Sequence, residues 1–530
     1  MTKTLVLKNG RIVTMDDHDC VAQAVAICGD RITAVGSVEE VLAHAGPCAE
    51  VVDLEGVTVL PGLIDTHAHF SRVGRLAAST ALLYDCTSIE EILSRLQARG
   101  DYLPDGAPIH GQGDCFRAAH FAEGRQICAS DLDRVAKDRP IVISDVHKRI
   151  VNSYVLEHCV QETPPAAAPF LPEDLRTGEV PGLFFSSAMG VVNIPGSPLD
   201  WSMETALQAS SAEFARYGVT TVADPHPTQD AITAYIALNQ AGKLDTRVVV
   251  LPATQHLEQP DLANGIPAYG PVGTCLRMGP AKQFYDSFIM HRTACMFEPY
   301  CGEPDNVGMT RLSLPDFRKR VEQFRSRGWP MAVHVTGDRG LVEVAQVLAE
   351  SPPSGAIGRS HVIHAYFPVP SSLQSLAESG VGMAVQPGFL RAWGETVKDF
   401  VGNVRAAKFL PLRTCLDSGV VLGGGSDAPI VHWNPFRGMA TAMDRQTLAG
   451  SVLGPEEGLT AREALALYTR TAAKVLDLDA DIGSVESGKL ADLTIVDRNV
   501  LACSPAELAQ TQVQTVIVAG RVVRSEHSGT

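Results

Sequence analysis

One stretch of the chain decides how its fold is interpreted: Val59-Leu60-Pro61-Gly62-Leu63-Ile64-Asp65-Thr66-His67-Ala68-His69. The apolar first half predicts a buried strand at 59–65. The two histidines that follow are spaced i, i+2, so an extended chain turns both imidazoles to the same face. Neutral imidazole is the commonest protein ligand of zinc, and two such rings at the end of a strand can reach one ion. Two unrelated histidines at a strand end are the alternative interpretation.

The middle of the chain alternates short β-like runs with helix-like segments, a pattern typical of a parallel α/β fold. Eight such runs, the number that closes a (β/α)8 TIM barrel, fall at 59–65, 218–224, 246–253, 280–286, 330–335, 360–365, 381–386 and 419–425. About 150 residues separate the first run from the second, far more than one crossover helix needs. We therefore expect an inserted subdomain at about 75–205, after barrel strand 1.

Both ends of the chain are rich in β-forming residues. Asn9-Gly10 lies between two β-like runs and predicts a hairpin. Leu493-Thr494-Ile495-Val496 and the run 515–523 have the same character near the C-terminus. We expect residues 1–60 and 481–530 to form the two parts of one small β-sandwich, on either side of a barrel domain at 61–480.

Composition narrows the class of protein. The chain has 530 residues, of which 45% are hydrophobic, and no apolar run long enough to cross a membrane. A net charge of −16 argues against nucleic acid or an anionic membrane as a partner, so a small-molecule substrate is expected. The N-terminal run lacks the apolar core of a signal peptide, and the twelve cysteines form no paired motif, so we expect a cytoplasmic protein. A homodimer is compatible with the sequence, because dimers are the commonest oligomers.

Chemically versatile side chains stand at the ends of several predicted strands. In a barrel of this kind, catalytic groups lie at the C-terminal ends of the strands. Ligands to a catalytic metal are neutral histidines and ionised carboxylates, with one position left open. The set that meets this requirement is His67, His69, Lys282, His334, His364 and Asp427.

Each member of this set also has a plainer interpretation. His334 or His364 alone would more often be an ordinary core or surface histidine. Asp427 stands in Ser426-Asp427-Ala428-Pro429, which resembles the start of a helix that a carboxylate caps. Lys282 is a poor ligand while protonated, unless its amine reacts with carbon dioxide to form a carboxylate that bridges two metals. The joint arrangement favours a metal site.

Further motifs resemble those of a known family. The glycine run before Asp427 and the stretch Ser487-Gly488-Lys489-Leu490-Ala491-Asp492-Leu493 resemble the amidohydrolase superfamily. Four other stretches resemble amidohydrolase family 3, the branch that contains N-substituted formamide deformylase: Val333-His334-Val335-Thr336-Gly337-Asp338-Arg339, Ala281-Lys282-Gln283-Phe284-Tyr285-Asp286, Arg292-Thr293-Ala294 and Asn434-Pro435. The likeness extends over nearly the whole chain.

The resemblance implies metal-assisted hydrolysis of a C–N bond. It carries over His67, His69, His334, His364 and Asp427 as metal ligands, with Lys282 as a carboxylated bridge; zinc is the expected ion, and one or two ions are left open. Asp427 would act as general base and then as general acid. An amide, formamide, carbamate or cyclic amide is the first choice of substrate.

Two departures from the family pattern affect the expected substrate pocket. The family usually has an acidic residue before the histidine at 364, where this chain has Ile363. The Asp-Gly pair common after the lysine strand is Asp286-Ser287 here. Neither change removes a ligand, but both weaken the transfer of an exact substrate.

Five residues are weaker candidates for substrate contacts. His147 and Asn152 lie in a family-like stretch of the insertion, where a strand-to-helix turn is the alternative. Arg292 is expected to pair either with a substrate oxygen or with Asp286. His432 and Trp433 follow Asp427 closely and are expected to line the cavity, although Trp433 could equally pack under the loop.

Two other functions stay open at this point. A deaminase would use the same metal site to expel ammonia from an aminated heterocycle. A catalytically silent metal-binding or regulatory protein could be built on the same barrel, although such a scaffold has no need of an open metal position.

Overall fold

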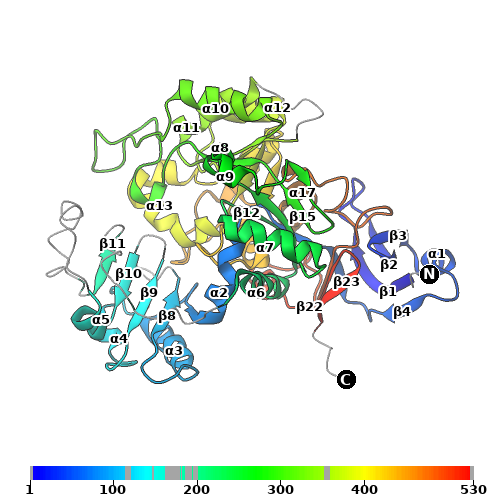
Figure 1. Cartoon of the computed structure of the whole chain (residues 1–530), viewed down its shortest axis with the longest axis horizontal. Helices are drawn as coiled ribbons and strands as arrows, with labels where there is room; N and C mark the ends of the chain where they lie inside the picture. The colour runs from blue at the N-terminus through cyan, green and yellow to red at the C-terminus, as the bar shows by residue number, and fades with distance from the viewer. Residues whose placement is uncertain are drawn as a thin grey trace.

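The structure is a computed structural model that describes residues 4–113, 121–145, 148–160, 180, 182–185, 194, 201–350 and 358–525. Figure 1 shows a β-rich unit that contains the N-terminus, a central body of strands covered by helices, and a separate sheet on the opposite side of the body. No helix among these residues has the length and apolar character needed to cross a membrane.

The central body contains two five-stranded sheets of mainly parallel strands. In hydrogen-bonded order the first comprises β14 (Gly270–Pro271), β15 (Leu276–Met278), β13 (Arg247–Leu251), β12 (Val219–Pro225) and β6 (Leu63–Asp65). The second comprises β16 (Ala281–Phe284), β17 (Met331–Val335), β18 (His361–His364), β19 (Gly382–Val385) and β20 (Leu422–Gly424). A parallel bridge between Ala253, just after β13, and Lys282 in β16 connects the two sheets, and Thr66 N, just after β6, donates to Gly424 O in β20 at 3.0 Å.

Helices follow the strands and cover their outer faces. They are α6 (Met203–Ala215), α7 (Gln229–Gln240), α8 (Thr254–Glu258), α9 (Pro260–Ala263), α10 (Leu314–Ser326), α11 (Asp338–Ala349), α12 (Pro370–Ser379), α13 (Gly388–Ala406), α14 (Leu412–Asp417), α15 (Pro435–Asp444), α16 (Ala461–Leu467) and α17 (Arg470–Val475), with 3-10 turns at Ile289–His291 and Pro455–Glu457. In α10 the Ser313 hydroxyl accepts from Asp316 N, and Phe317, Val321 and Phe324 are buried on one face. The N-cap and the helical spacing of the buried residues therefore both favour a helix in this segment.

The strand predicted at 59–65 is two strands in two different sheets. β5 (Thr58–Pro61) pairs with a C-terminal strand, whereas β6 pairs with β12. Gly62 separates them, and its N–H donates to Asp492 O at 2.7 Å. A Cβ at position 62 would lie 2.2 Å from Thr220 Oγ1, so only glycine permits this close approach. The prediction of one strand was wrong because this backbone contact leaves no mark in the apolar pattern.

Both ends of the chain contribute to one eight-stranded sheet. Its strands are β1 (Thr4–Val13), β2 (Val21–Cys28), β3 (Arg31–Gly36), β4 (Glu50–Asp53), β5, β21 (Leu493–Val496), β22 (Val513–Val518) and β23 (Arg521–Ser525), with α1 (Val38–Ala45) and α18 (Pro505–Leu508) between them. Apolar side chains from both arms, such as Ile27 and Ile517, share one cluster. The buried ion pair Arg247–Asp492, 3.1 Å long, ties this sheet to β13.

The inserted segment carries its own sheet and core. The sheet comprises β7 (Thr80–Leu82), β8 (Ile109–Gln112), β9 (Ile141–Ser144), β10 (Lys148–Val151) and β11 (Leu183–Phe185), with α3 (Ile89–Gly100), α4 (Ala129–Leu132) and α5 (Ser153–His158). Helix α2 (Phe70–Ser79) instead packs on α6, where a Cβ on Gly74 would lie 2.2 Å from Ala206 O. The separate sheet therefore starts at Thr80, a few residues later than the sequence indicates.

Candidate metal centre

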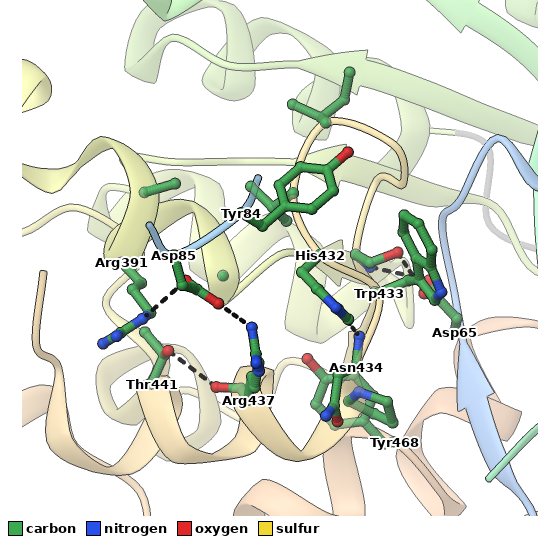
Figure 2. A pocket seen from close by; sticks show the side chains of 18 of the residues that line it. Asp65, Tyr84, Asp85, Arg391, His432, Trp433, Asn434, Arg437, Thr441 and Tyr468 are labelled. Carbon is green, nitrogen blue, oxygen red and sulfur yellow. Dashed lines mark hydrogen bonds and ion pairs between the residues drawn. The ribbon is translucent and has the colours of Figure 1, made fainter. Parts of the chain in front are cut away.

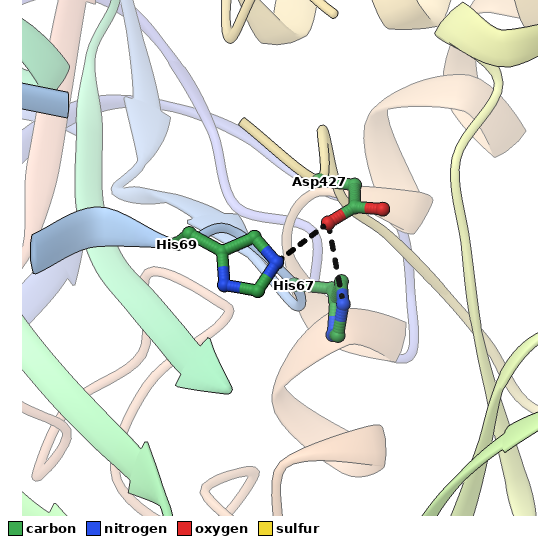
Figure 3. Close-up of side chains that lie close together, drawn as sticks. All are labelled: His67, His69 and Asp427. Carbon is green, nitrogen blue, oxygen red and sulfur yellow. Dashed lines mark ion pairs between the residues drawn. The ribbon is translucent and has the colours of Figure 1, made fainter. Parts of the chain in front are cut away.

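Three of the predicted ligands form a compact cluster at the ends of β6 and β20. Nε2 of His67 lies 3.4 Å and Nε2 of His69 lies 3.3 Å from the same atom, Oδ1 of Asp427. Figure 3 shows both rings directed at that oxygen. The donor atoms lie within 4.8 Å of one another, as required of ligands that share one ion. Asp427 adopts a positive φ of 55°, and its N–H donates to His67 O, which fixes the carboxylate beside the ring.

Two buried polar atoms of this cluster lack hydrogen-bond partners. Oδ1 of Asp427 and Nδ1 of His67 are buried and have no hydrogen-bond partner within the described ranges. Burying such atoms unpaired is costly unless a further group compensates them. A divalent cation bound by the Nε2 atoms of His67 and His69 and by Oδ1 of Asp427 would compensate this carboxylate oxygen, so the residues present fit a metal ion.

Two more histidines and the lysine extend the cluster along β18, β17 and β16. His364 places Nε2 4.0 Å from Oδ2 of Asp427, and its ring centre lies 5.3 Å from that of His67. The His334 and His364 ring centres are 4.6 Å apart. Lys282 is buried, and in the part of the chain that the structure describes its Nζ has no hydrogen-bond partner. The fold thus brings all six predicted ligand residues to one region of the two sheets.

The hydrogen bonds of His364 and His334 decide which ring nitrogen each can offer. Nδ1 of His364 lies 2.8 Å from Oε1 of Gln386, an atom that can only accept. Nε2 of His334 lies 3.0 Å from the carbonyl oxygen of Ser287. These nitrogens therefore carry the proton in each neutral ring, leaving Nε2 of His364 and Nδ1 of His334 as lone-pair donors.

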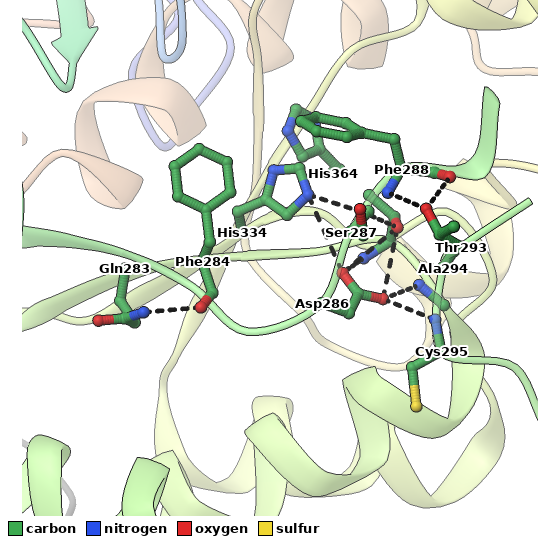
Figure 4. A network of polar contacts seen from close by, with 12 residues as sticks. Gln283, Phe284, Asp286, Ser287, Phe288, Thr293, Ala294, Cys295, His334 and His364 are labelled. Carbon is green, nitrogen blue, oxygen red and sulfur yellow. Dashed lines mark hydrogen bonds and ion pairs between the residues drawn. The ribbon is translucent and has the colours of Figure 1, made fainter. Parts of the chain in front are cut away.

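A buried carboxylate holds the carbonyl that orients His334. Asp286 accepts hydrogen bonds from the backbone N–H groups of Thr336 at 2.9 Å, Gly337 at 2.8 Å and Cys295 at 3.1 Å (Figure 4). The three bonds tie the segment after β16 to the segment after β17, where His334 stands. Burial raises the pKa of Asp286 to about 7, against the effect of its hydrogen bonds. Asp286 is thus a positioning residue and not the partner of Arg292.

Asp65 likewise holds together the two segments that carry His67 and Asp427. Its carboxylate accepts from His67 N at 3.0 Å, from Ser426 N at 3.0 Å and from the Ser426 hydroxyl at 2.6 Å. These bonds join the ends of β6 and β20, on which His67 and Asp427 stand. Burial raises the pKa of Asp65 to about 7.

Burial keeps the predicted ligands in the protonation states that a metal requires. It lowers the pKa of His67 and of His334 well below the usual value, and that of His364 to about 4, so these rings are neutral at pH 7. Burial also lowers the pKa of the Lys282 amine to about 7, which leaves a substantial unprotonated fraction at neutral pH.

Asn152 and Arg292, two of the weaker candidates for substrate contacts, bind other groups of the protein. Asn152 is fully buried, where Oδ1 accepts from Ile141 N and Val155 N and Nδ2 donates to two carbonyls, so its amide caps α5. Arg292 forms a 2.6 Å ion pair with Glu303, and among the described residues it forms none with Asp286, one of its two expected partners. His147 lies outside the described residues.

His432 and Trp433 line a pocket that also contains Tyr84 and Asp85 (Figure 2). The two rings stack with centres 5.2 Å apart, and Nδ1 of His432 accepts from Asn434 N. Trp433 is 1% exposed and packs on Phe214, as expected of a side chain beneath the loop. None of the six predicted metal ligands is among the lining residues described for this pocket.

Sequence reasoning missed the residues that orient the ligands. Gln386 directly follows β19 and lies within the strand predicted at 381–386, so its place at that strand's C-terminal end was the available signal. Asp65 stands two residues before His67 within the opening stretch, yet its buried carboxylate was not recognised as a hydrogen-bond acceptor. Asp286 was considered only as a partner for Arg292.

The chain is similar to known proteins over nearly its whole length. A model of the Amidohydrolase family matches residues 50–524. The chain is 29% identical to N-substituted formamide deformylase from Arthrobacter pascens, with 99% of each chain covered, and 26% identical to the putative amidohydrolase YtcJ from Bacillus subtilis (strain 168), with 97% of this chain and 98% of that protein covered.

A solved structure shares the fold. The crystal structure of an uncharacterised metal-dependent hydrolase from Pyrococcus horikoshii OT3 aligns with a TM-score of 0.73 at 24% identity, over 95% of this chain and 99% of that one. The chain belongs to the amidohydrolase family. It is a metal-dependent hydrolase that acts on C–N bonds other than peptide bonds.

Proposed function

We propose that this enzyme hydrolyses a linear amide, with N-substituted formamides as the first substrates to test. The observation that carries the proposal is the convergence of His67 and His69 on one buried, unpartnered oxygen of Asp427. The formamide is suggested by the name of the relative from Arthrobacter pascens, which the chain matches over its whole length. Carbamates and cyclic amides are further substrates within the same bond class.

The residues divide into two groups of ligands. His67, His69 and Oδ1 of Asp427 would hold one ion, while His334 and His364 would hold a second together with a carboxylated Lys282. Zinc is the ion we expect, since these are neutral imidazole and carboxylate donors. When bound, a divalent ion acts as a Lewis acid and lowers the pKa of a water ligand to about 7.

Carboxylation would turn Lys282 from an unsuitable group into a ligand. The unprotonated amine attacks carbon dioxide, a C–N bond forms, and one proton leaves, giving a carbamate with one negative charge. The pKa of about 7 supplies the unprotonated amine that this reaction consumes. The buried position of Nζ, which lacks a hydrogen-bond partner among the described residues, leaves it free to react.

Proton transfer falls to Asp427. Its Oδ1 faces the two histidines, whereas Oδ2 lies 4.0 Å from His364 and is left to exchange protons. We assign to this carboxylate the proton of the attacking water, which it then delivers to the departing nitrogen, so that an amine leaves and a carboxylic acid is formed. The carboxylate returns to its ionised state in each cycle.

We further propose that the two central sheets work as one closed (β/α)8 barrel within residues 61–480. The bridge from Ala253 to Lys282 and the bond from Thr66 to Gly424 support closure, because they connect β13 with β16 and β6 with β20 across the two sheets. In such a barrel the ligands stand where catalytic groups are found, at the C-terminal ends of the strands.

Turnover of a substrate panel by the zinc-loaded enzyme tests the function. We expect N-substituted formamides to release formate and amine. Ammonia released from aminated heterocycles without a new carboxylate would instead identify a deaminase. The variant Asp427→Asn should lose at least about 100-fold in kcat, the usual scale of general acid–base catalysis, while elemental analysis shows metal still bound. Unchanged chemistry in that variant, or no turnover of any C–N substrate, would contradict the proposal.

A further inference from the structure

Arg311 is held above two aromatic rings that belong to the metal centre. Its Cζ lies 5.0 Å from the ring centre of Phe284 and 5.6 Å from that of Phe288. Both rings contact His334, with centres 4.6 Å and 5.2 Å from the imidazole. Phe284 ends β16, the strand that carries Lys282, and Nζ of Lys282 lies 5.0 Å from the same ring centre. The guanidinium and the buried amine therefore share one aromatic neighbour.

The backbone around Arg311 is fixed before any ligand arrives. Arg311 N donates to Tyr285 O at 2.7 Å, and Thr310 forms a bridge with Asp286, the carboxylate that organises the His334 segment. Two residues later Ser313 caps α10. A side chain that starts from an anchored backbone and stacks on two rings loses little conformational freedom on binding.

The charge of Arg311 has no counterpart among the described residues. The residue is exposed, and no carboxylate within the described ranges forms an ion pair or hydrogen bond with its guanidinium. A cation–π contact uses no N–H group as a conventional hydrogen-bond donor, so the N–H groups of this guanidinium stay available for a ligand. Those donors match the two oxygens of a carboxylate in a bidentate arrangement.

The neighbouring cavity is basic although the chain is acidic. It opens beside His69 and is lined on its polar side by Ser71, Arg72, Arg75, His226 and Thr228. Nε of Arg75 is buried without a hydrogen-bond partner in the described structure. No Asp or Glu is among the described lining residues, whereas the whole chain has a net charge of −16.

An aromatic contact connects this cavity with Arg311. The ring centre of His226 lies 6.3 Å from that of Phe284, on which Arg311 stacks. The arginines of this cavity therefore lie near His69, and the guanidinium of Arg311 lies near His334, both predicted ligands. Basic groups near a site favour an anionic substrate both in binding and in the rate of encounter.

We propose that Arg311 binds a carboxylate on the substrate, so that the enzyme prefers N-acyl compounds derived from amino acids over those derived from uncharged amines. This inference rests on the proposed function, since it concerns the substrate of the same site. Arg311 binds and orients the substrate and takes no part in the proton transfers assigned to Asp427.

A matched pair of ligands tests the proposal without depending on turnover. N-formylphenylalanine and N-formyl-2-phenylethylamine differ only in the carboxylate. Their Kd values can be measured by calorimetry on zinc-loaded proteins that all carry Asp427→Asn, so that little substrate is hydrolysed during the titration. We expect the reference protein, in which Arg311 is intact, to bind the carboxylate compound at least about tenfold more tightly, as a charge-assisted pair predicts. In Arg311→Met this ratio should fall to about one.

Arg327→Met is the matched control. Arg327 directly follows α10, and its Cζ lies 5.4 Å from the ring centre of Phe324 on that helix. Its replacement should leave the ratio of the two Kd values as in the reference protein. A reference protein that shows no preference or binds neither compound, or an Arg311→Met protein that keeps the preference, would overturn the inference. Hydrolysis of the uncharged formamide is a separate readout, and it reports on the proposed function alone.

Discussion

Nδ1 of His364 lies 2.8 Å from Oε1 of Gln386, and the amide nitrogen of Gln386 donates to Ala384 O at 3.1 Å. The second bond settles which end of the amide faces the imidazole, because only its oxygen can accept. Nδ1 must then carry the proton, so Nε2, 4.0 Å from Oδ2 of Asp427, offers its lone pair. Gln386, which follows β19, thereby fixes the tautomer of His364, the predicted ligand at the end of β18.

Gln386→Leu should therefore weaken metal binding by about 10- to 100-fold, as loss of a ligand's hydrogen-bond partner does in other metal sites. Competition with a chromogenic chelator would measure the Kd for zinc. Gln386→Glu keeps an acceptor for Nδ1–H and should restore most of the affinity. Gln374→Leu, which removes an exposed hydrogen bond to Glu378 on α12, is the control. Equal Kd values for Gln386→Leu and the wild type would refute the assigned tautomer.

The sequence pointed to the six candidate ligands because they stand within or just after predicted strands, and a barrel brings strand ends together. It did not identify Gln386, because the available signal was its place at the end of the strand predicted at 381–386, and its partner is 22 residues away. Nor did it separate β5 from β6, because the close contact of Gly62 with Thr220 joins residues far apart in the chain. For Asn152 the structure matches the alternative interpretation, a strand-to-helix turn, because its side chain caps α5 directly after β10.

Removal of metal should lower the melting temperature of the protein. The unpartnered Oδ1 of Asp427 loses its compensation without an ion, and a ligand that binds only the folded state stabilises that state by about 3–4 kcal/mol at 100- to 1,000-fold excess over Kd. Scanning calorimetry after chelation and again after addition of zinc would show the fall and its recovery. In His69→Asn the same treatment should produce a smaller difference. Identical melting curves with and without zinc would count against a metal centre.

Lys282→Met should stabilise the metal-free protein in a pH-dependent way. In the folded chain the pKa of the amine is about 7, against 10.5 for an exposed lysine. Between these values the unfolded chain binds more protons, so this residue makes stability rise with pH. Below pH 7 folding buries a charged amine at full cost, on the order of several kcal/mol.

The difference in melting temperature between Lys282→Met and the wild type isolates this contribution, because other titrating groups are common to both proteins. We expect the variant to melt higher at pH 6 and the difference to shrink by pH 9, in buffers free of metal and carbon dioxide. A difference that stays constant with pH would show that the amine is not held in an unfavourable charged state.

Asp286→Asn should destabilise the protein and loosen the metal site together. The carboxylate uses Oδ1 for Thr336 N–H and Oδ2 for the N–H groups of Gly337 and Cys295, so an asparagine, with one acceptor oxygen, leaves at least one buried N–H unpaired. An unpaired buried donor costs about 1–3 kcal/mol. Ser287 follows directly in the chain, and its carbonyl oxygen orients His334, so affinity for the metal should fall as well.

Calorimetry and zinc titration of the same sample would measure both effects. Asp305→Asn removes an exposed carboxylate from the same connection between β16 and α10 and should change neither quantity. The two effects are linked by one physical cause, because a single set of hydrogen bonds both holds the two segments together and places the Ser287 carbonyl. A variant that melts lower but binds zinc as the wild type does would separate them, and would show that His334 is oriented independently of Asp286.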